Sequence, residues 1–87
     1  MRIRVRRTGG FAGIERSAEV DTSGRPDAAE WHALAGAVLA DGDDRAEGVP
    51  DGFRYEITVD AHTVHCGDPR LTEAQRTLVS RVLKEGA

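Results

Sequence analysis

The stretch FRYEITVDAHTVHC, residues 53–66, alternates apolar and polar side chains on both sides of Asp60 and Ala61. A period of two predicts a half-buried strand, and two such runs joined by two residues predict a β-hairpin. Alanine is a poor second residue for a type I′ turn, so the turn supports this register less well than the alternation does. The expected cross-strand pairs are Val59 with His62, Ile57 with Val64, and Tyr55 with Cys66.

A second pair of alternating runs opens the chain. Residues 1–7, MRIRVRR, place Ile3 and Val5 on one face and arginines on the other. Residues 14–21, IERSAEVD, alternate in the same way, with Arg16 as the imperfect position. Two strands separated by about six residues that include glycine predict a hairpin with a long loop.

Residues 27–40, DAAEWHALAGAVLA, have the apolar spacing of an amphipathic helix. Asp27 with Glu30 resembles a capping box at its start. Gly36 costs about 1 kcal/mol against alanine inside a helix, and it would allow the helix to approach the sheet closely. The expected core stripe is Trp31, Leu34, Ala35, Val38 and Leu39, with Trp31 buried against the sheet.

A second helix is expected after GDPR, residues 67–70. Thr72 and Gln75 form a capping box at its start, and Gly86 lies where it would stop. Its expected core face contains Ala74, Leu78 and Val82, with Val79 and Leu83 beside them.

The order β-β-α-β-β-α predicts an α+β fold for a single domain, residues 1–87. Two hairpins can share one four-stranded antiparallel sheet, with both helices packed on one face and the other face in water. A chain of this length buries a modest core. We expect a monomer.

The composition narrows the function classes. The net charge is −3, and 11 of the 12 basic residues are arginine, a bias typical of a GC-rich genome. This balance gives no reason to expect a nucleic-acid partner. No apolar run is long enough to cross a bilayer, so no membrane partner is expected. Without a leader at Met1 we expect a cytoplasmic protein, although export by a leaderless route stays open.

His62, His65 and Cys66 are the residues most suggestive of a metal site. On a strand, however, His65 points to the opposite face from the other two, which lie roughly 13 Å apart along the strand. Zinc ligands must converge on one ion, so we expect neither a metal site nor any other cofactor. Cys66 falls on the core face, where a thiol is inert, and the sequence therefore points away from an enzyme.

Two surface features remain. Arg2, Arg4 and Arg6 align on one face, which suggests an RNA-contacting module as an alternative function. No aromatic residues interleave with them, so a solvated outer face or edge-strand charges that block aggregation are the favoured interpretations. The second feature is Phe11 in TGGFAG, which either folds back onto the core or is presented to a partner. We predict presentation.

Taken together, TGGFAG, IERSAEVDT, the Trp/Leu helix, YEITVDAHTVHC and LTEAQRTLVSRVL resemble the emfourin family over nearly the whole chain. Emfourin inhibits protealysin, a thermolysin-like zinc metallopeptidase. The resemblance implies a non-enzymatic inhibitor that blocks the cleft of such a peptidase by tight protein–protein binding.

The topology suggests where that binding would occur. If the first helix returns the chain to the glycine-rich end, then residues 9–13, 41–52 and 67–70 share one edge of the sheet. Loops held by a rigid sheet are the usual place for binding residues. Whether residues 41–52 take part stays open. The predicted protease-binding residues are Gly9, Gly10, Phe11, Ala12, Gly13, Asp68, Pro69 and Arg70.

Overall fold

The computed structural model describes residues 1–9, 15–41, 53–67 and 71–86. Its elements follow the expected order. They are β1 (Arg2–Gly9), β2 (Arg16–Asp21), α1 (Ala28–Asp41), β3 (Phe53–Val59), β4 (His62–Gly67) and α2 (Glu73–Glu85). The first strand therefore runs two residues beyond the expected 1–7.

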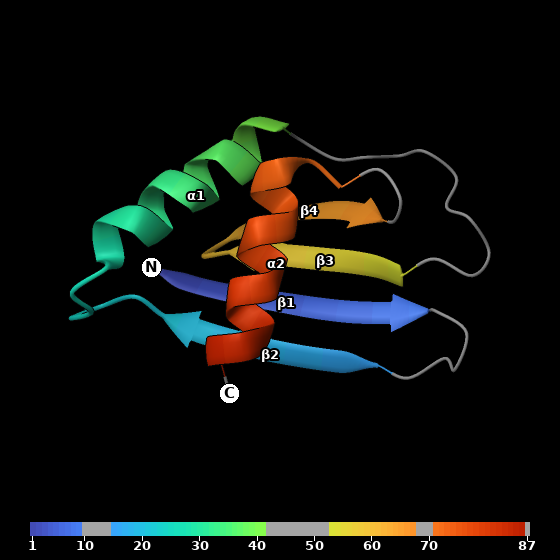
Figure 1. Ribbon diagram of the computed structural model, residues 1–87, viewed down its shortest axis with the longest axis horizontal. Helices are drawn as coiled ribbons and strands as arrows, with labels where there is room; N and C mark the ends of the chain where they lie inside the picture. The colour runs from blue at the N-terminus through green and yellow to red at the C-terminus, as the bar shows by residue number, and fades with distance from the viewer. Residues whose placement is uncertain (10–14, 42–52, 68–70, 87) are drawn as a thin grey trace.

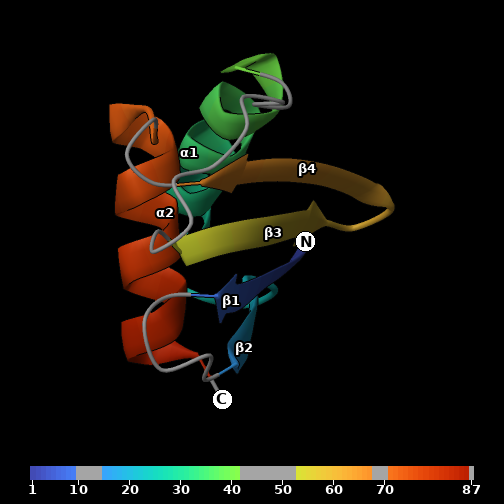
Figure 2. The same ribbon diagram turned by 90° about the vertical axis from the view of Figure 1, so that its right-hand side faces the viewer.

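The four strands form one antiparallel sheet in the order β2-β1-β3-β4, which confirms the α+β fold. Both helices cover the same face, and α2 crosses the strands (Figures 1 and 2). We call this the inner face and the opposite one the outer face. Because β1 and β3 are the central strands, the arginines of β1 do not protect an edge, and that interpretation is wrong.

The second hairpin has the predicted register, with Val59 opposite His62 and Tyr55 opposite Cys66. Of its two turn residues, Asp60 has a positive φ of 52° and Ala61 does not. This φ pattern is that of a type II′ turn, in which only the first central residue has positive φ. Alanine is therefore tolerated at the second place.

The core lies between the inner face and the two helices. Trp31 is fully buried, as predicted, and Leu34 and Leu39 pack at the margin. On the sheet side, the alternate residues of each strand that point to the inner face form the core. Phe53, at the start of β3, points to this face but is only partly buried. The buried apolar residues are Ile3, Val5, Ala18, Val20, Trp31, Ala35, Val38, Tyr55, Ile57, Val59, Val64, Cys66, Leu78, Val79 and Val82.

The helix ends agree only in part with the sequence predictions. Thr72 and Gln75 form the expected capping box of α2. The Asp27 carboxylate instead accepts hydrogen bonds from Arg25, Arg81 and the Trp31 indole. The expected capping box of α1 is therefore wrong, because three side-chain donors occupy that carboxylate.

The glycine inside α1 and the glycine at the end of α2 have different surroundings. A Cβ on Gly36 would meet nothing within 4 Å, so the expected close approach of α1 to the sheet is wrong. Gly86 has φ −79°, which any residue can adopt. A Cβ there would lie 2.6 Å from the Val82 oxygen and 2.8 Å from the Glu19 oxygen. Gly86 is thus required for space, where α2 ends against β2.

In the described part of the chain, no helix is both long and apolar enough to cross a membrane.

Candidate functional site

The predicted binding residues fall largely outside the part of the chain that the structure describes. Gly10, Phe11, Ala12 and Gly13 lie outside it, as do Asp68, Pro69 and Arg70. Gly9 is described: it is the last residue of β1, pairs with Phe53 and has φ 83°. This left-handed backbone favours glycine, which gives Gly9 a conformational role at this position.

The strand ends that flank the three internal gaps meet at one end of the sheet. Gly9 pairs with Phe53, Arg54 pairs with Gly67, and β2 begins at Arg16 beside Arg7. The Asp60-Ala61 turn lies at the opposite end, where the Asp60 N–H donates to the Arg2 carbonyl at 2.9 Å. We call the first of these the Gly9 end; it is at the right in Figure 1.

The inner face of the Gly9 end carries an arginine over an aromatic ring. The Arg7 guanidinium lies 4.4 Å from the centre of the Phe53 ring, a cation–π distance. The Phe53 and Tyr55 rings are 6.4 Å apart and tilted. The Arg7 Nε is buried and has no hydrogen-bond acceptor among the described residues. Such a donor is expensive to bury, so it needs an explanation.

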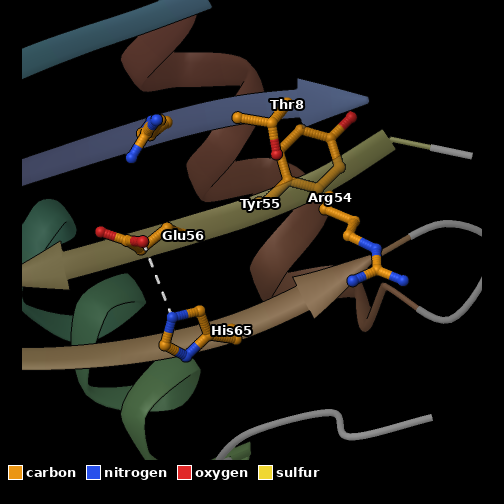
Figure 3. A pocket seen from close by; sticks show the side chains of 6 residues that line it. Thr8, Arg54, Tyr55, Glu56 and His65 are labelled. Atoms are coloured by element: carbon orange, nitrogen blue, oxygen red, sulfur yellow. Dashed lines mark ion pairs between the residues drawn. The ribbon is translucent and has the colours of Figure 1, made fainter. Parts of the chain in front are cut away.

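The outer face of the same end is polar and slightly hollowed. The hollow holds about 220 Å³ and is lined by Arg6, Thr8, Arg54, Tyr55, Glu56 and His65. In Figure 3, Glu56 and His65 point toward each other, and Arg54 extends toward the end of β4. The His65 Nε2 is 3.7 Å from Glu56. Small-molecule sites usually enclose about 300–1,000 Å³, so this shallow surface suits contact with another macromolecule better.

Arg6 is tied to Glu15 by two hydrogen bonds of 2.8 and 3.0 Å. Hydrogen bonding from Arg6, followed by its charge, lowers the pKa of Glu15, and the same carboxylate raises the pKa of Arg6. Arg2 likewise pairs with Glu19 at 3.0 Å. The outer arginine row therefore has carboxylates beside it, which weakens the RNA-contacting alternative, since phosphates would compete with these ion pairs.

His62, His65 and Cys66 do not come together in the structure as metal ligands would. Cys66 is buried on the inner face, whereas His65 is exposed on the outer face. Among the described residues, no group of three or more His, Cys, Asp or Glu side chains could hold a metal ion. Buried Cys66 is also poorly placed for nucleophilic attack on a substrate.

Arg7 is a candidate site residue that the sequence patterns did not single out. In β1 it shares the inner face with Ile3 and Val5, where the alternation calls for an apolar side chain. Arg16, the imperfect position of β2, lies directly opposite it. Each arginine interrupts the apolar alternation of its strand, and the two interruptions lie opposite each other. This coincidence is the sequence signal that could have identified the pair.

A comparison with known protein families finds a match over most of the chain. The family described as Emfourin matches residues 5–83, which include all six elements in whole or in part. This family is known by name as an inhibitor family of protealysin-type metallopeptidases. No curated protein and no solved structure matched the chain. Since the family match covers far more than half of the 87 residues, the chain belongs to the Emfourin family.

Proposed function

We propose that this protein inhibits thermolysin-like zinc metallopeptidases by occupying their active-site cleft. Membership of the Emfourin family over residues 5–83 is the observation that carries the proposal. The protein would bind as a monomer, perform no reaction and need no cofactor, since steric exclusion of substrate is enough to stop cleavage.

The Gly9 end is the part of the molecule best suited to enter a cleft. A four-stranded sheet holds Gly9, Arg16, Phe53 and Gly67 in fixed relation there. Binding residues commonly lie on segments that a rigid scaffold positions, and residues 10–14 and 68–70 are attached at these points. We therefore keep residues 9–13 and 68–70 as the proposed contact segments.

Phe11 is the proposed anchor within residues 9–13. Thermolysin-like enzymes favour large apolar residues just after the scissile bond, as the resemblance implies, and a phenylalanine suits such a pocket. Flanking glycines let a backbone lie close to a partner's wall. Large aromatic anchors in central pockets commonly dominate interface energies.

The direct test measures peptidase activity with a small peptide substrate. The purified protein is added to thermolysin and to a protealysin-type enzyme, and we expect dose-dependent, competitive inhibition. Added Zn²⁺ should not restore activity, which separates occupation of the cleft from removal of the metal. Full activity of several such enzymes at a large molar excess of the protein would overturn the proposal.

A further inference from the structure

Two arginines occupy neighbouring inner-face positions of the sheet at the Gly9 end. Arg7 of β1 and Arg16 of β2 are cross-strand partners. Side chains in such positions have Cβ atoms about 4.5–5.5 Å apart, and like charges there destabilise a sheet. The repulsion between the two charges therefore opposes folding, although each arginine also makes a stabilising contact of its own.

Neither arginine forms an ion pair with a residue that the structure describes. One Arg16 NH2 group donates to the Leu83 carbonyl at 2.7 Å, which leaves the rest of its exposed guanidinium available. Arg7 lies over Phe53, and its Nε has no acceptor in the described part of the chain. By contrast, Arg2, Arg6, Arg25 and Arg81 each have a carboxylate partner within 4 Å.

Arg7 is also held in place. Stacking over Phe53 restricts the guanidinium, and partial burial of Arg7 strengthens any charged hydrogen bond that it makes. Guanidinium groups match carboxylates in a planar, bidentate geometry, and arginines that are already oriented are frequent hot spots of protein interfaces. A carboxylate on a partner has the chemistry that such a guanidinium binds.

We propose that Arg7 and Arg16 bind aspartate or glutamate side chains of the target peptidase, with Phe53 orienting Arg7. This inference rests on the proposed function and names the chemistry that its interface uses. Carboxylates at these positions neutralise the like charges and accept from the terminal N–H groups of the half-buried Arg7 and of the exposed Arg16. Binding therefore gains a charged contact while removing a repulsion that the free protein carries.

The test compares Arg7→Met and Arg16→Met with the matched control Arg4→Met. Methionine keeps an unbranched apolar stem and removes the charge. Arg4 lies on the outer face of the same strand and forms no ion pair with a described residue. We expect Arg7→Met to raise the inhibition constant at least tenfold against the same peptidase, mainly by faster dissociation, and Arg4→Met to change it less than about threefold.

Two further readouts separate binding from folding. The melting temperature of Arg7→Met should stay the same or rise, because the substitution removes a like-charge pair and an unsatisfied donor. Wild-type inhibition should weaken between about 0.05 M and about 0.5 M NaCl, and the Arg7→Met variant should lose part of this dependence. Arg7→Lys, which keeps charge without the fork, should fall between wild type and Arg7→Met.

The outcomes distinguish this inference from the proposed function. Wild-type inhibition with unchanged inhibition constants for both Met variants would overturn the arginine pair and leave the inhibitor function standing. A sharp loss of thermal stability in Arg7→Met, with unchanged inhibition by the folded fraction, would make Arg7 a structural residue. If Arg7→Met fails to fold, salt-independent inhibition by the wild type would still overturn the inference. No inhibition by the wild type overturns both.

Discussion

At the scale of single residues, Asp27 shows how one carboxylate can join two helices. Its Oδ2 accepts from the Trp31 Nε1 and from Arg81, both at 3.1 Å, while Oδ1 accepts from Arg25 at 3.0 Å. The Arg81 guanidinium also lies 4.3 Å from the centre of the Trp31 ring. Asp27 therefore satisfies the buried indole and ties the start of α1 to the last turns of α2.

This arrangement predicts an acid-sensitive contribution to stability. Hydrogen bonding from Arg25 is the largest of the effects that lower the pKa of Asp27 from its ordinary 3.8. The folded state thus binds this proton less readily than the unfolded chain. The contribution is present above that ordinary pKa and is lost as the pH falls through the lower folded value.

We expect Asp27→Asn to lower the melting temperature at pH 7, with the difference from wild type shrinking below about pH 4. The matched control is Glu30→Gln, an exposed carboxylate in the first turn of the same helix. Thermal unfolding followed by circular dichroism from pH 2 to pH 7 makes the measurement. A difference that does not depend on pH would show that the charge of Asp27 does not stabilise the fold.

At the scale of elements, the periodicities of two and 3.6 were enough to predict each strand and helix in the described part of the chain. They succeed because burial of one face is what orders a small chain, as Ile57 and Val64 show in the second hairpin. Local hydrogen-bond assignments were less predictable. One hydrogen bond to the Asp27 carboxylate comes from Arg81, which is 54 residues away in the sequence. The carboxylate's partners follow from tertiary packing, so the capping pattern alone could not identify them.

The glycines of the two helices give an element-scale prediction. Gly36 is exposed within α1 with nothing near its Cβ position, so Gly36→Ala should stabilise the protein by about 0.5–1 kcal/mol. The melting temperature should rise by roughly 2–8 °C. Gly86→Ala is the contrasting control and should lower it, because the new Cβ would meet the Val82 and Glu19 oxygens. A loss of stability in Gly36→Ala would mean that this position needs glycine for another reason.

At the scale of the whole molecule, the residues that build the core and the residues proposed to bind a partner lie in different regions. Trp31 and Val82 are buried where the helices pack, whereas Arg7 and Phe53 mark the Gly9 end. The proposed binding region follows from topology, since the turn of the first hairpin and the free ends of the second, Phe53 and Gly67, lie at the same end of the sheet. The breaks at Arg7 and Arg16 are visible in the sequence one by one, but the cost of the two charges becomes visible only when the register places Arg16 opposite Arg7.

This division predicts opposite effects for two aromatic substitutions. Trp31→Ala should cost roughly 3–5 kcal/mol of stability, because it removes a fully buried side chain from the core. Its inhibition constant, corrected for the folded fraction, should stay near the wild-type value. Phe11→Ala should instead weaken inhibition by about 2 kcal/mol, some thirtyfold, with little change in melting temperature.

Denaturant unfolding and inhibition of one peptidase, measured on the same preparations, test both variants together. The Phe11 result bears on the choice between an anchor presented to a partner and a plug that closes the core. If Phe11→Ala melts much earlier and its folded fraction inhibits as well as wild type, Phe11 is a plug. Binding would then have to depend on charged contacts such as those of Arg7 and Arg16. In that case Arg7→Met should raise the inhibition constant by a larger factor than Phe11→Ala does.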